Sequence, residues 1–216
     1  MKLGIKFMGI CLIIGGIVTG CHHVEKTYYP SGQLQSEITY LSEQMDGPAY
    51  WYYENGQLSM VSAYQKGQLN GEMIRYYRNG KIETECFYQN DTLEGLFKSY
   101  NEQGVLCLQI TYKNGQRHGP YKENYADGSP YIEGFYHHDQ IDGHWKYYDY
   151  EGYEVAYADF EQGSGVFTAY KNGFLYMKAE YKNSVIDGNE TYYLPNGEID
   201  KILTYKNGKI INDNNE

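Results

Sequence analysis

The fold is decided by one stretch, Tyr52-Tyr53-Glu54-Asn55-Gly56-Gln57-Leu58, which continues to Tyr64-Gln65-Lys66-Gly67-Gln68-Leu69-Asn70-Gly71. Asn-Gly between two segments of alternating polarity is a strong hairpin signal, because a type I′ turn needs positive φ at both central residues. We predict such a turn at Asn55-Gly56 and a longer turn closed by Asn70-Gly71. The stretch therefore predicts a unit of two strands and two turns.

The same unit recurs along the chain. Glycines of a first series are 24 residues apart, with one step of 21: Gly32, Gly56, Gly80, Gly104, Gly128, Gly152, Gly173 and Gly197. A second series keeps the same period: Gly47, Gly71, Gly95, Gly119 and Gly143. Further short turns are predicted at Asn79-Gly80, Asp127-Gly128, Asn172-Gly173 and Asn196-Gly197, and further long turns at Asp46-Gly47, Asp142-Gly143 and Asp187-Gly188. A fixed period of this size indicates a repeat array.

Aromatic residues mark the face that packs. The eighth residue after each first-series glycine is aromatic: Tyr40, Tyr64, Tyr88, Tyr112, Tyr136, Phe160, Tyr181 and Tyr205. The second residue is mostly apolar, and even offsets share one face because successive strand residues point to opposite sides. Large residues also lie two positions after Gly71, Gly95, Gly119, Gly143 and Gly165: Met73, Phe97, Tyr121, Trp145 and Phe167. We expect one packed and one wetted face, with tyrosine suited to a shallow core.

One repeat is irregular, because Gly152 and Gly173 are 21 residues apart instead of 24. Phe160 keeps its aromatic offset, so we expect the first strand of this repeat to be intact. The missing residues should come from the turns, which would make the segment Glu161–Gly165 a tighter turn. The sheet itself should continue without a break.

The first 20 residues predict a signal peptide. Lys2 and Lys6 precede an apolar run, residues 7–18, that is too short for a comfortable membrane span. The four residues Val18-Thr19-Gly20-Cys21 resemble the lipobox of bacterial lipoproteins. That resemblance implies cleavage before Cys21 and lipidation of this residue. We therefore expect a signal peptide at 1–20, an anchor and spacer at 21–27, the array at 28–211 and a polar tail at 212–216.

Charge and cysteine usage narrow the classes of partner. The formal net charge is −10, and removal of two lysines with the signal peptide makes it −12. An acidic domain argues against a nucleic-acid partner and would attract a basic partner.

Cys86 and Cys107 lie at offsets six and three from their repeat glycines. Their side chains should therefore point to opposite faces of the sheet and form no disulfide, and we expect both to be small apolar residues that fill the core.

The repeat resembles the MORN repeat in its bacterial variant form. The pattern is Tyr-x-Asn-Gly-x-Leu followed by Tyr-Lys-Asn-Gly-x-x-x-Gly-x-Tyr, and it fits well at Tyr52–Gly71, Tyr76–Gly95, Tyr100–Gly119 and Tyr192–Gly208. The resemblance covers residues 28 to 211 in about eight units. It implies an all-β fold: an elongated, twisted, single-layer antiparallel sheet of consecutive β-hairpins. It also implies a scaffold for protein contact, and variant-repeat proteins of this kind are often antitoxin-like.

The histidines, the Asp-Gly segments and one Gly-Ser-Gly segment are the candidate sites for chemistry. His118, His137, His138 and His144 fall in or beside the turns of neighbouring repeats, but no short spacing fixes three or four converging ligands, so no metal site is predicted. His22-His23 is expected to be a flexible spacer. The Asp-Gly segments lack the pattern of a calcium loop, and Gly163-Ser164-Gly165 lacks the context of a nucleophile elbow.

These observations favour a protein without catalytic activity and without a cofactor. The leading hypothesis is a lipid-anchored envelope protein, periplasmic or surface-exposed, whose repeat surface binds another protein, with immunity or antitoxin-like binding as one version. Two alternatives stay open. One is an envelope enzyme or glycan-binding groove, since tyrosines can hold sugar rings, and the other is a structural or lipid-contacting scaffold.

Overall fold

The computed structural model describes residues 21–213, so the predicted signal peptide (1–20) and the end of the predicted tail (214–216) lie outside it. The described residues form strands connected by turns and short loops, in two compact units. One unit runs to Glu94 and includes Glu102–Gly104, and the other comprises Gly95–Asn101 and the chain from Val105 onward. Among these residues no helix is long and apolar enough to cross a membrane.

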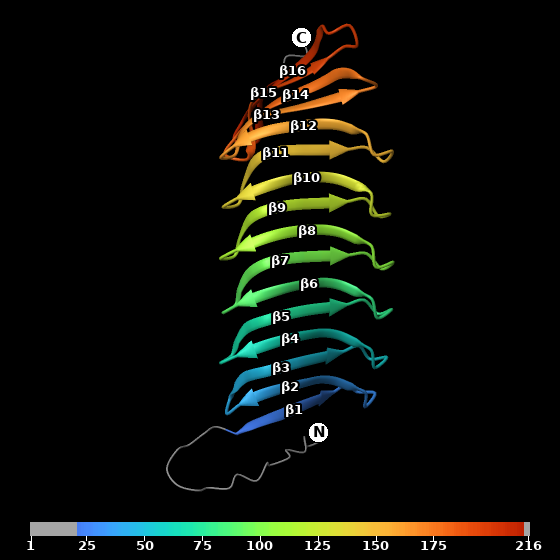
Figure 1. The fold of residues 1–216 in the computed structure, drawn as a ribbon, viewed down its shortest axis with the longest axis vertical. Coiled ribbons are helices and arrows are strands. Elements are labelled where there is room, and N and C mark those ends of the chain that lie inside the picture. The colour runs from blue at the N-terminus through green and yellow to red at the C-terminus, as the bar shows by residue number, and fades with distance from the viewer. Residues whose placement is uncertain (1–20, 214–216) are drawn as a thin grey trace. The chain divides into compact units, whose positions relative to one another are not determined.

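Consecutive strands pair antiparallel within each unit, which confirms the predicted fold class of consecutive β-hairpins (Figure 1). The first unit contains β1 (His22–Tyr28), β2 (Leu34–Leu41), β3 (Gln44–Tyr52), β4 (Leu58–Gln65), β5 (Gln68–Tyr76) and β6 (Ile82–Gln89). The strand β7 (Thr92–Tyr100) lies in the second unit from Gly95 on.

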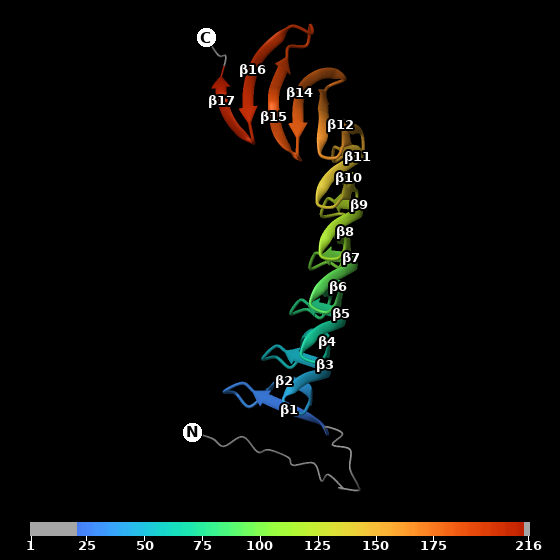
Figure 2. The same cartoon turned by 90° about the vertical axis from the view of Figure 1, so that its left-hand side faces the viewer.

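The other strands of the second unit are β8 (Leu106–Lys113), β9 (Gln116–Asn124), β10 (Pro130–His137), β11 (Gln140–Tyr148), β12 (Glu154–Glu161), β13 (Ser164–Lys171), β14 (Phe174–Lys182), β15 (Val185–Tyr193), β16 (Ile199–Lys206) and β17 (Lys209–Asp213). Figure 2 shows β14 to β17 lying beside one another in a single layer. Asn212 and Asp213, predicted as tail, are part of β17.

The predicted spacer is wrong, because the first strand begins directly after Cys21. His22 pairs with Leu41 and His23 with Tyr40 in the β1–β2 ladder. The His23 ring also stacks on the Tyr40 ring, with 5.5 Å between the ring centroids. The two histidines therefore belong to the sheet, and the described array starts six residues earlier than residue 28.

The short turns lie at the opposite strand ends from those predicted. Two-residue turns with positive φ at both positions, as in type I′, are formed by Lys66-Gly67, Asn90-Asp91, Asn114-Gly115, His138-Asp139, Gln162-Gly163, Asn172-Gly173, Asn183-Ser184 and Asn207-Gly208. Of the predicted type I′ turns, Asn172-Gly173 is confirmed, with φ of 51° and 79°.

The other four pairs predicted as short turns, Asn55-Gly56, Asn79-Gly80, Asp127-Gly128 and Asn196-Gly197, lie in five-residue loops instead. In the first of these, Tyr53 N–H donates to the Gln57 carbonyl at 2.7 Å and Gly56 N–H to the Tyr53 carbonyl at 2.8 Å. Asn55 Oδ1 accepts from Gln57 N–H at 3.0 Å. Asn55 therefore stabilises the loop through its side-chain oxygen. Of the Asn55-Gly56 pair, only Gly56 has a positive φ, 83°. Asn79, Asp127 and Asn196 accept in the same way.

The second glycine series marks β-bulges inside strands, so the long turns predicted there are wrong. Gly71 lies within β5 at φ 135°. Ser62 pairs with Met73 but Tyr64 pairs with Leu69, so three residues of β5 face one residue of β4. A Cβ atom at Gly71 would lie 2.8 Å from the Ala63 Cβ atom, so both the backbone and the space require glycine.

The irregular repeat has lost its bulge. β12 is intact, as predicted, and its ladder with β13 runs without a register shift. Gln162-Gly163 is the usual two-residue turn, so the expected tighter turn is wrong. At the other end of β13, the two-residue turn Asn172-Gly173 replaces the five-residue loop.

The turns also bind one repeat to the next. In five of the two-residue turns, the second residue donates its N–H to a carbonyl 22 residues earlier, as in Gly67 to Met45 at 2.8 Å and Gly163 to Ile141 at 2.8 Å. In the five-residue loops 29–33, 53–57 and 125–129, which begin with tyrosine, the hydroxyl of this residue donates to a carbonyl 23 residues later, as in Tyr125 to Tyr148 at 2.8 Å. Both edges of a unit are thereby fixed.

The core of each unit is shallow and centred on small side chains. The sixth residue after a first-series glycine is buried in six of the eight repeats: Ser62, Cys86, Ile110, Ala158, Ala179 and Leu203. In the second unit, Trp145, Ala158 and Phe160 form the buried cluster, with tyrosines packed around it. Cys86 is buried and Cys107 is half-buried, and both are free thiols.

Candidate functional site

The predicted lipidation residue, Cys21, is exposed and directly precedes β1. The residues of the predicted signal peptide lie outside the described part of the chain, so lipidation stays a prediction. The position does have one structural consequence. Any group attached at Cys21 would be one residue away from the hydrogen-bonded ladder that begins at the His22–Leu41 pair.

Tyrosines gather on and beside two five-residue loops of the second unit, residues 125–129 and 149–153: Tyr125 is half-buried, whereas Tyr131, Tyr150 and Tyr153 are exposed. Both loops have the same construction. Gly128 and Gly152, at φ 93° and 86°, donate their N–H to the first carbonyl of the loop. In the second loop Asp149 Oδ1 accepts from Tyr153 N–H at 2.8 Å, which fixes the backbone that carries the tyrosines.

The tyrosine rings contact one another across the two loops. The Tyr125 ring lies 4.8 Å from the Tyr131 ring and 4.9 Å from the Tyr150 ring, centroid to centroid. Tyr150 and Tyr153 are 60% and 71% exposed, so they add apolar surface that the fold itself does not cover. We call Tyr125, Tyr131, Tyr150 and Tyr153 the tyrosine patch.

Acidic groups accompany the tyrosine patch. The charge of Asp127, which also accepts a hydrogen bond from the Tyr150 hydroxyl, raises the pKa of that hydroxyl. Hydrogen bonds from the Ser129 hydroxyl and backbone N–H in turn lower the pKa of Asp127. Asp127 therefore stays charged at neutral pH beside an exposed aromatic ring, an arrangement that suits a cationic side chain.

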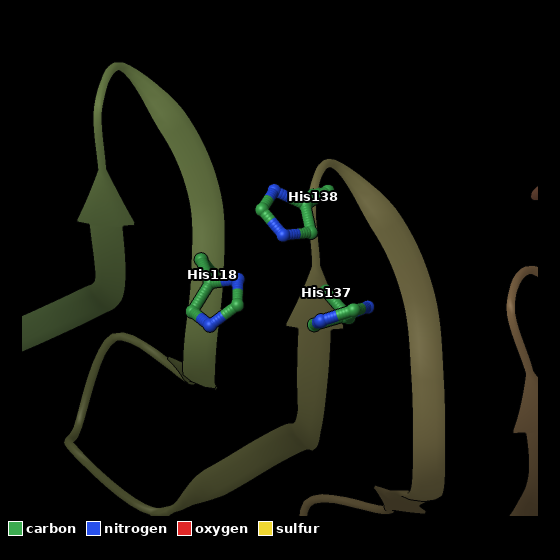
Figure 3. A group of neighbouring side chains, drawn as sticks. All are labelled: His118, His137 and His138. Carbon is green, nitrogen blue, oxygen red and sulfur yellow. The ribbon is translucent and has the colours of Figure 1, made fainter.

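Three histidines meet at the other end of the β9 and β10 strands (Figure 3). Tyr136 of β10 pairs with Gly119 of β9, so the next pair along this register is His137 and His118. His138 is the first residue of the turn that follows β10, and its φ of 50° turns the chain there. Successive strand residues would point apart, but this turn brings the rings of His137 and His138 to 4.5 Å.

The three imidazoles form a compact group. The His118 ring lies 4.9 Å from the His137 ring and 4.8 Å from the His138 ring. One ligand nitrogen of each residue lies within 4.8 Å of the others. Burial lowers the pKa of His118, and the two neighbouring histidines lower it further. His118 is accordingly held in its neutral form, which has a lone pair.

The fourth candidate histidine lies elsewhere. His144 Nδ1 is 2.7 Å from Asp159 Oδ1 on the neighbouring strand β12, and its ring stacks on Tyr157 at 6.1 Å. His144 is thus engaged in a cross-strand pair outside the group of three.

The Asp-Gly segments have a structural role. Asp46, Asp142 and Asp187 each accept a hydrogen bond from the backbone N–H that opens a later two-residue turn, at 3.0, 3.0 and 3.1 Å. The aspartate before a bulge glycine therefore anchors the next hairpin. Gly163-Ser164-Gly165 continues from a two-residue turn into β13, so it is a strand start.

The fold and its contacts define a class of protein: a repeat array whose unit is a β-hairpin that docks on the previous hairpin through its turns. The family model described as MORN repeat variant matches residues 24–41, 45–66, 69–90, 93–114, 117–138 and 186–207. These segments make up more than half of the 216 residues. The chain therefore belongs to the MORN repeat variant family. A search of the curated proteins found no match.

The matched segments leave out residues 139–185. This part contains the β12–β13 hairpin without a bulge and the short Asn172-Gly173 turn, so the departure from the family pattern coincides with the structural irregularity. It still pairs as antiparallel strands, and it supplies the buried residues Trp145, Ala158 and Phe160.

Sequence reasoning missed both groups of side chains. The tyrosine patch depends on which tyrosines lie outside the packed face. The periodic aromatic positions do not include Tyr150 or Tyr153, so they did not predict the exposure of these two residues. The histidines were noticed, but their convergence depends on the β9–β10 register and on the turn at His138. The sequence does contain a signal for this pair. A hairpin register counted from the two-residue turns places His118 opposite His137.

Proposed function

We propose that this protein is a lipid-anchored scaffold of the bacterial cell envelope that binds another protein through the tyrosine patch. The observation that carries the proposal is the contact of the half-buried Tyr125 ring with the exposed rings of Tyr131 and Tyr150, together with exposed Tyr153 on the same closed loop as Tyr150. Tyrosine is enriched at protein interfaces because its ring supplies contact area with little loss of conformational entropy.

The proposed partner carries a basic surface. Asp127 and Asp149 lie in the two loops of the patch, and the chain as a whole is acidic, with a formal net charge of −10. Lysine and arginine side chains are attracted both to carboxylates and to the faces of tyrosine rings. Immunity or antitoxin-like binding is one version of this proposal, in which the partner is a toxin with such a surface.

Anchoring is proposed from the sequence around Cys21. A positive start, a short apolar run and Val18-Thr19-Gly20-Cys21 support cleavage and lipidation, and several acyl chains give stable attachment to a membrane. Replacement of Cys21 by alanine should release the protein from the membrane fraction or leave it uncleaved. Unchanged fractionation and unchanged size of the variant would contradict the anchor.

Binding is tested by crosslinking in intact envelopes. The full chain is compared with the double variant Tyr150→Ser/Tyr153→Ser, which removes the most exposed rings of the patch. The matched control is Ile210→Ser/Ile211→Ser, because these side chains are 56% and 64% exposed on a different part of the unit. We expect a crosslinked protein whose yield falls about tenfold or more in the tyrosine variant and stays unchanged in the control.

Three outcomes would overturn the proposal. Recovery of lipids without any protein would favour a lipid-contacting scaffold, and recovery of glycan would favour a carbohydrate-binding surface. Equal loss of the crosslinked protein in both double variants would show that the tyrosine patch is not the binding surface.

A further inference from the structure

We propose that His118, His137 and His138 form a binding site for a divalent transition-metal ion, with Zn²⁺ as the ion that fits them best. The inference goes beyond the proposed scaffold function and depends neither on the anchor nor on the tyrosine patch. It rests on the geometry of the paired strands β9 and β10 with the turn that follows β10, and on the chemistry of three imidazoles, which suit Zn²⁺ and its neighbours in the first transition row.

The backbone holds the three residues in place. Asp139, the second residue of the turn, donates its N–H to the Arg117 carbonyl at 2.9 Å, and its Oδ1 accepts from Arg117 N–H at 3.0 Å. The turn that carries His138 is thereby docked on the residue before His118. His137 is the last residue of β10, opposite His118 in the extended register. All three side chains are consequently fixed to rigid elements at one edge of the unit.

The surroundings of His118 and His138 indicate that a nitrogen of each ring can bind a metal ion. Nδ1 of His118 is buried and has no hydrogen-bond partner among the described residues. A buried polar atom without a partner is costly and is unusual in a folded protein, and a metal ion would satisfy it. His138 Nδ1 lies 3.0 Å from Gln116 Oε1. With Nδ1–H as donor to this oxygen, Nε2 presents its lone pair, as in many metal-binding histidines.

The distances require a small adjustment. Ligand nitrogens at Zn–N distances of 2.0–2.1 Å lie about 3.3 Å apart in a tetrahedron. The three nitrogens here lie within 4.8 Å of one another. His137 and His138 are exposed, so rotation of these two side chains can close the gap without moving the backbone. The fourth position would face solvent, because two of the three ligands lie on the surface.

The surrounding charges are already neutralised in part. The Arg117 guanidinium is paired with Asp139, with Nε and Oδ1 3.0 Å apart, and it lies over the Tyr136 ring at 4.1 Å. This pairing limits its repulsion of a cation. The ligand set consists of imidazoles, whereas Ca²⁺ and Mg²⁺ require oxygen ligands, so the site is assigned to a transition-metal ion.

The experiment is isothermal titration of the full chain, solubilised in detergent and purified without a histidine tag, with ZnCl₂. We expect one Zn²⁺ per chain, and an affinity at least about tenfold lower in His118→Ala. The same loss is expected in His137→Ala/His138→Ala, whose replaced side chains are exposed. Circular dichroism verifies that each variant is folded. Titration with Co²⁺ provides a second readout, since a tetrahedral site gives characteristic visible absorption.

The controls remove histidines outside the group. His144→Ala and His22→Ala/His23→Ala should leave Zn²⁺ affinity and stoichiometry unchanged. The proposal is overturned if the full chain shows no saturable binding of Zn²⁺. It is also overturned if the folded double variant His137→Ala/His138→Ala binds as tightly as the natural chain, or if His144→Ala abolishes binding.

Discussion

The indole ring of Trp145 lies directly against Gly134 on the neighbouring strand, in the place where any other residue would carry its Cβ atom. Gly134 has no positive φ, so glycine is required here for space alone. It occupies the sixth offset of its repeat, where other repeats carry small buried residues such as Ser62 and Ala158. The largest core residue of the unit is thus matched to the smallest one across the ladder.

Replacement of Gly134 by alanine should destabilise the protein by about 1–3 kcal/mol, because the added methyl group overlaps the Trp145 ring. The midpoint of chemical denaturation measures this loss. The same substitution made in a Trp145→Leu background should cost less, because the smaller side chain leaves room for the methyl group. Equal costs in the two backgrounds would show that the two residues are not coupled.

Much of the fold could be predicted because glycine and aromatic residues recur together. Glycines at bulges and glycines in loops both need positive φ, so the sequence does not distinguish them. The glycine period therefore predicts hairpins, but it does not indicate which glycines lie in turns and which lie in bulges. The type I′ turn predicted at Asn55-Gly56 is wrong for this reason. Its asparagine serves as a side-chain acceptor for Gln57, whereas the true two-residue turns include Asn90-Asp91 and Asn183-Ser184, which have no glycine.

The histidine group was not predicted, because its geometry depends on that same choice of turn. With the tight turn placed at His138-Asp139, His137 pairs with Gln140 and His118 lies opposite His137. With the turn placed elsewhere, as the sequence pattern favoured, the three residues have no fixed relation. A wrong prediction of the turn type therefore prevents prediction of the candidate site, although it does not change the prediction of the sheet.

Asp142 is expected to stabilise the turn of the following hairpin. Its Oδ1 accepts a hydrogen bond from Gln162 N–H at 3.0 Å, and Gln162 has a φ of 49°. Asp142→Ala should lower the free energy of unfolding by about 1 kcal/mol, since this N–H loses its acceptor. Hydrogen exchange at the Gln162 amide should also become faster.

The matched control for this hydrogen bond is Asp142→Asn, which keeps an oxygen acceptor in the same place. It should retain most of the stability and most of the amide protection. If the asparagine variant loses as much as the alanine variant, the negative charge and not the hydrogen bond is responsible.

Tyr147 predicts a loss of stability in alkaline solution. Burial raises the pKa of its hydroxyl above the ordinary value, and its ring packs against Phe167 with centroids 5.0 Å apart. Above about pH 10 the unfolded chain loses this proton while the folded chain keeps it, so the free energy of unfolding falls as pH rises. At pH values below the pKa of this hydroxyl in the unfolded chain, the stability that is lost in alkaline solution is fully present.

Tyr147→Phe should therefore make the urea midpoint less sensitive to pH above about 10, because the ring is kept and the ionisable hydroxyl is removed. Tyr153→Phe is the control variant, because it removes a hydroxyl from a residue that is 71% exposed. Identical alkaline slopes for the natural chain and Tyr147→Phe would show that ionisation of this residue does not limit stability.

Gln116 is expected to act as a positioning residue for the proposed metal site. Its Oε1 lies 3.0 Å from His138 Nδ1, so it orients the ring and fixes which nitrogen carries the proton. Loss of such a partner typically weakens metal binding about 10–100-fold. Gln116→Ala should therefore weaken Zn²⁺ binding within this range while all three histidines remain.

The matched control is Gln68→Ala, because Gln68 follows the two-residue turn Lys66-Gly67 in the same way that Gln116 follows Asn114-Gly115. This variant should bind Zn²⁺ like the natural chain. Gln116→Glu separates positioning from general destabilisation, since a carboxylate still accepts from His138 Nδ1–H and should restore binding. If the alanine and glutamate variants are equally weak, Gln116 does not work through His138, and the nitrogen assigned to the metal on this ring is wrong.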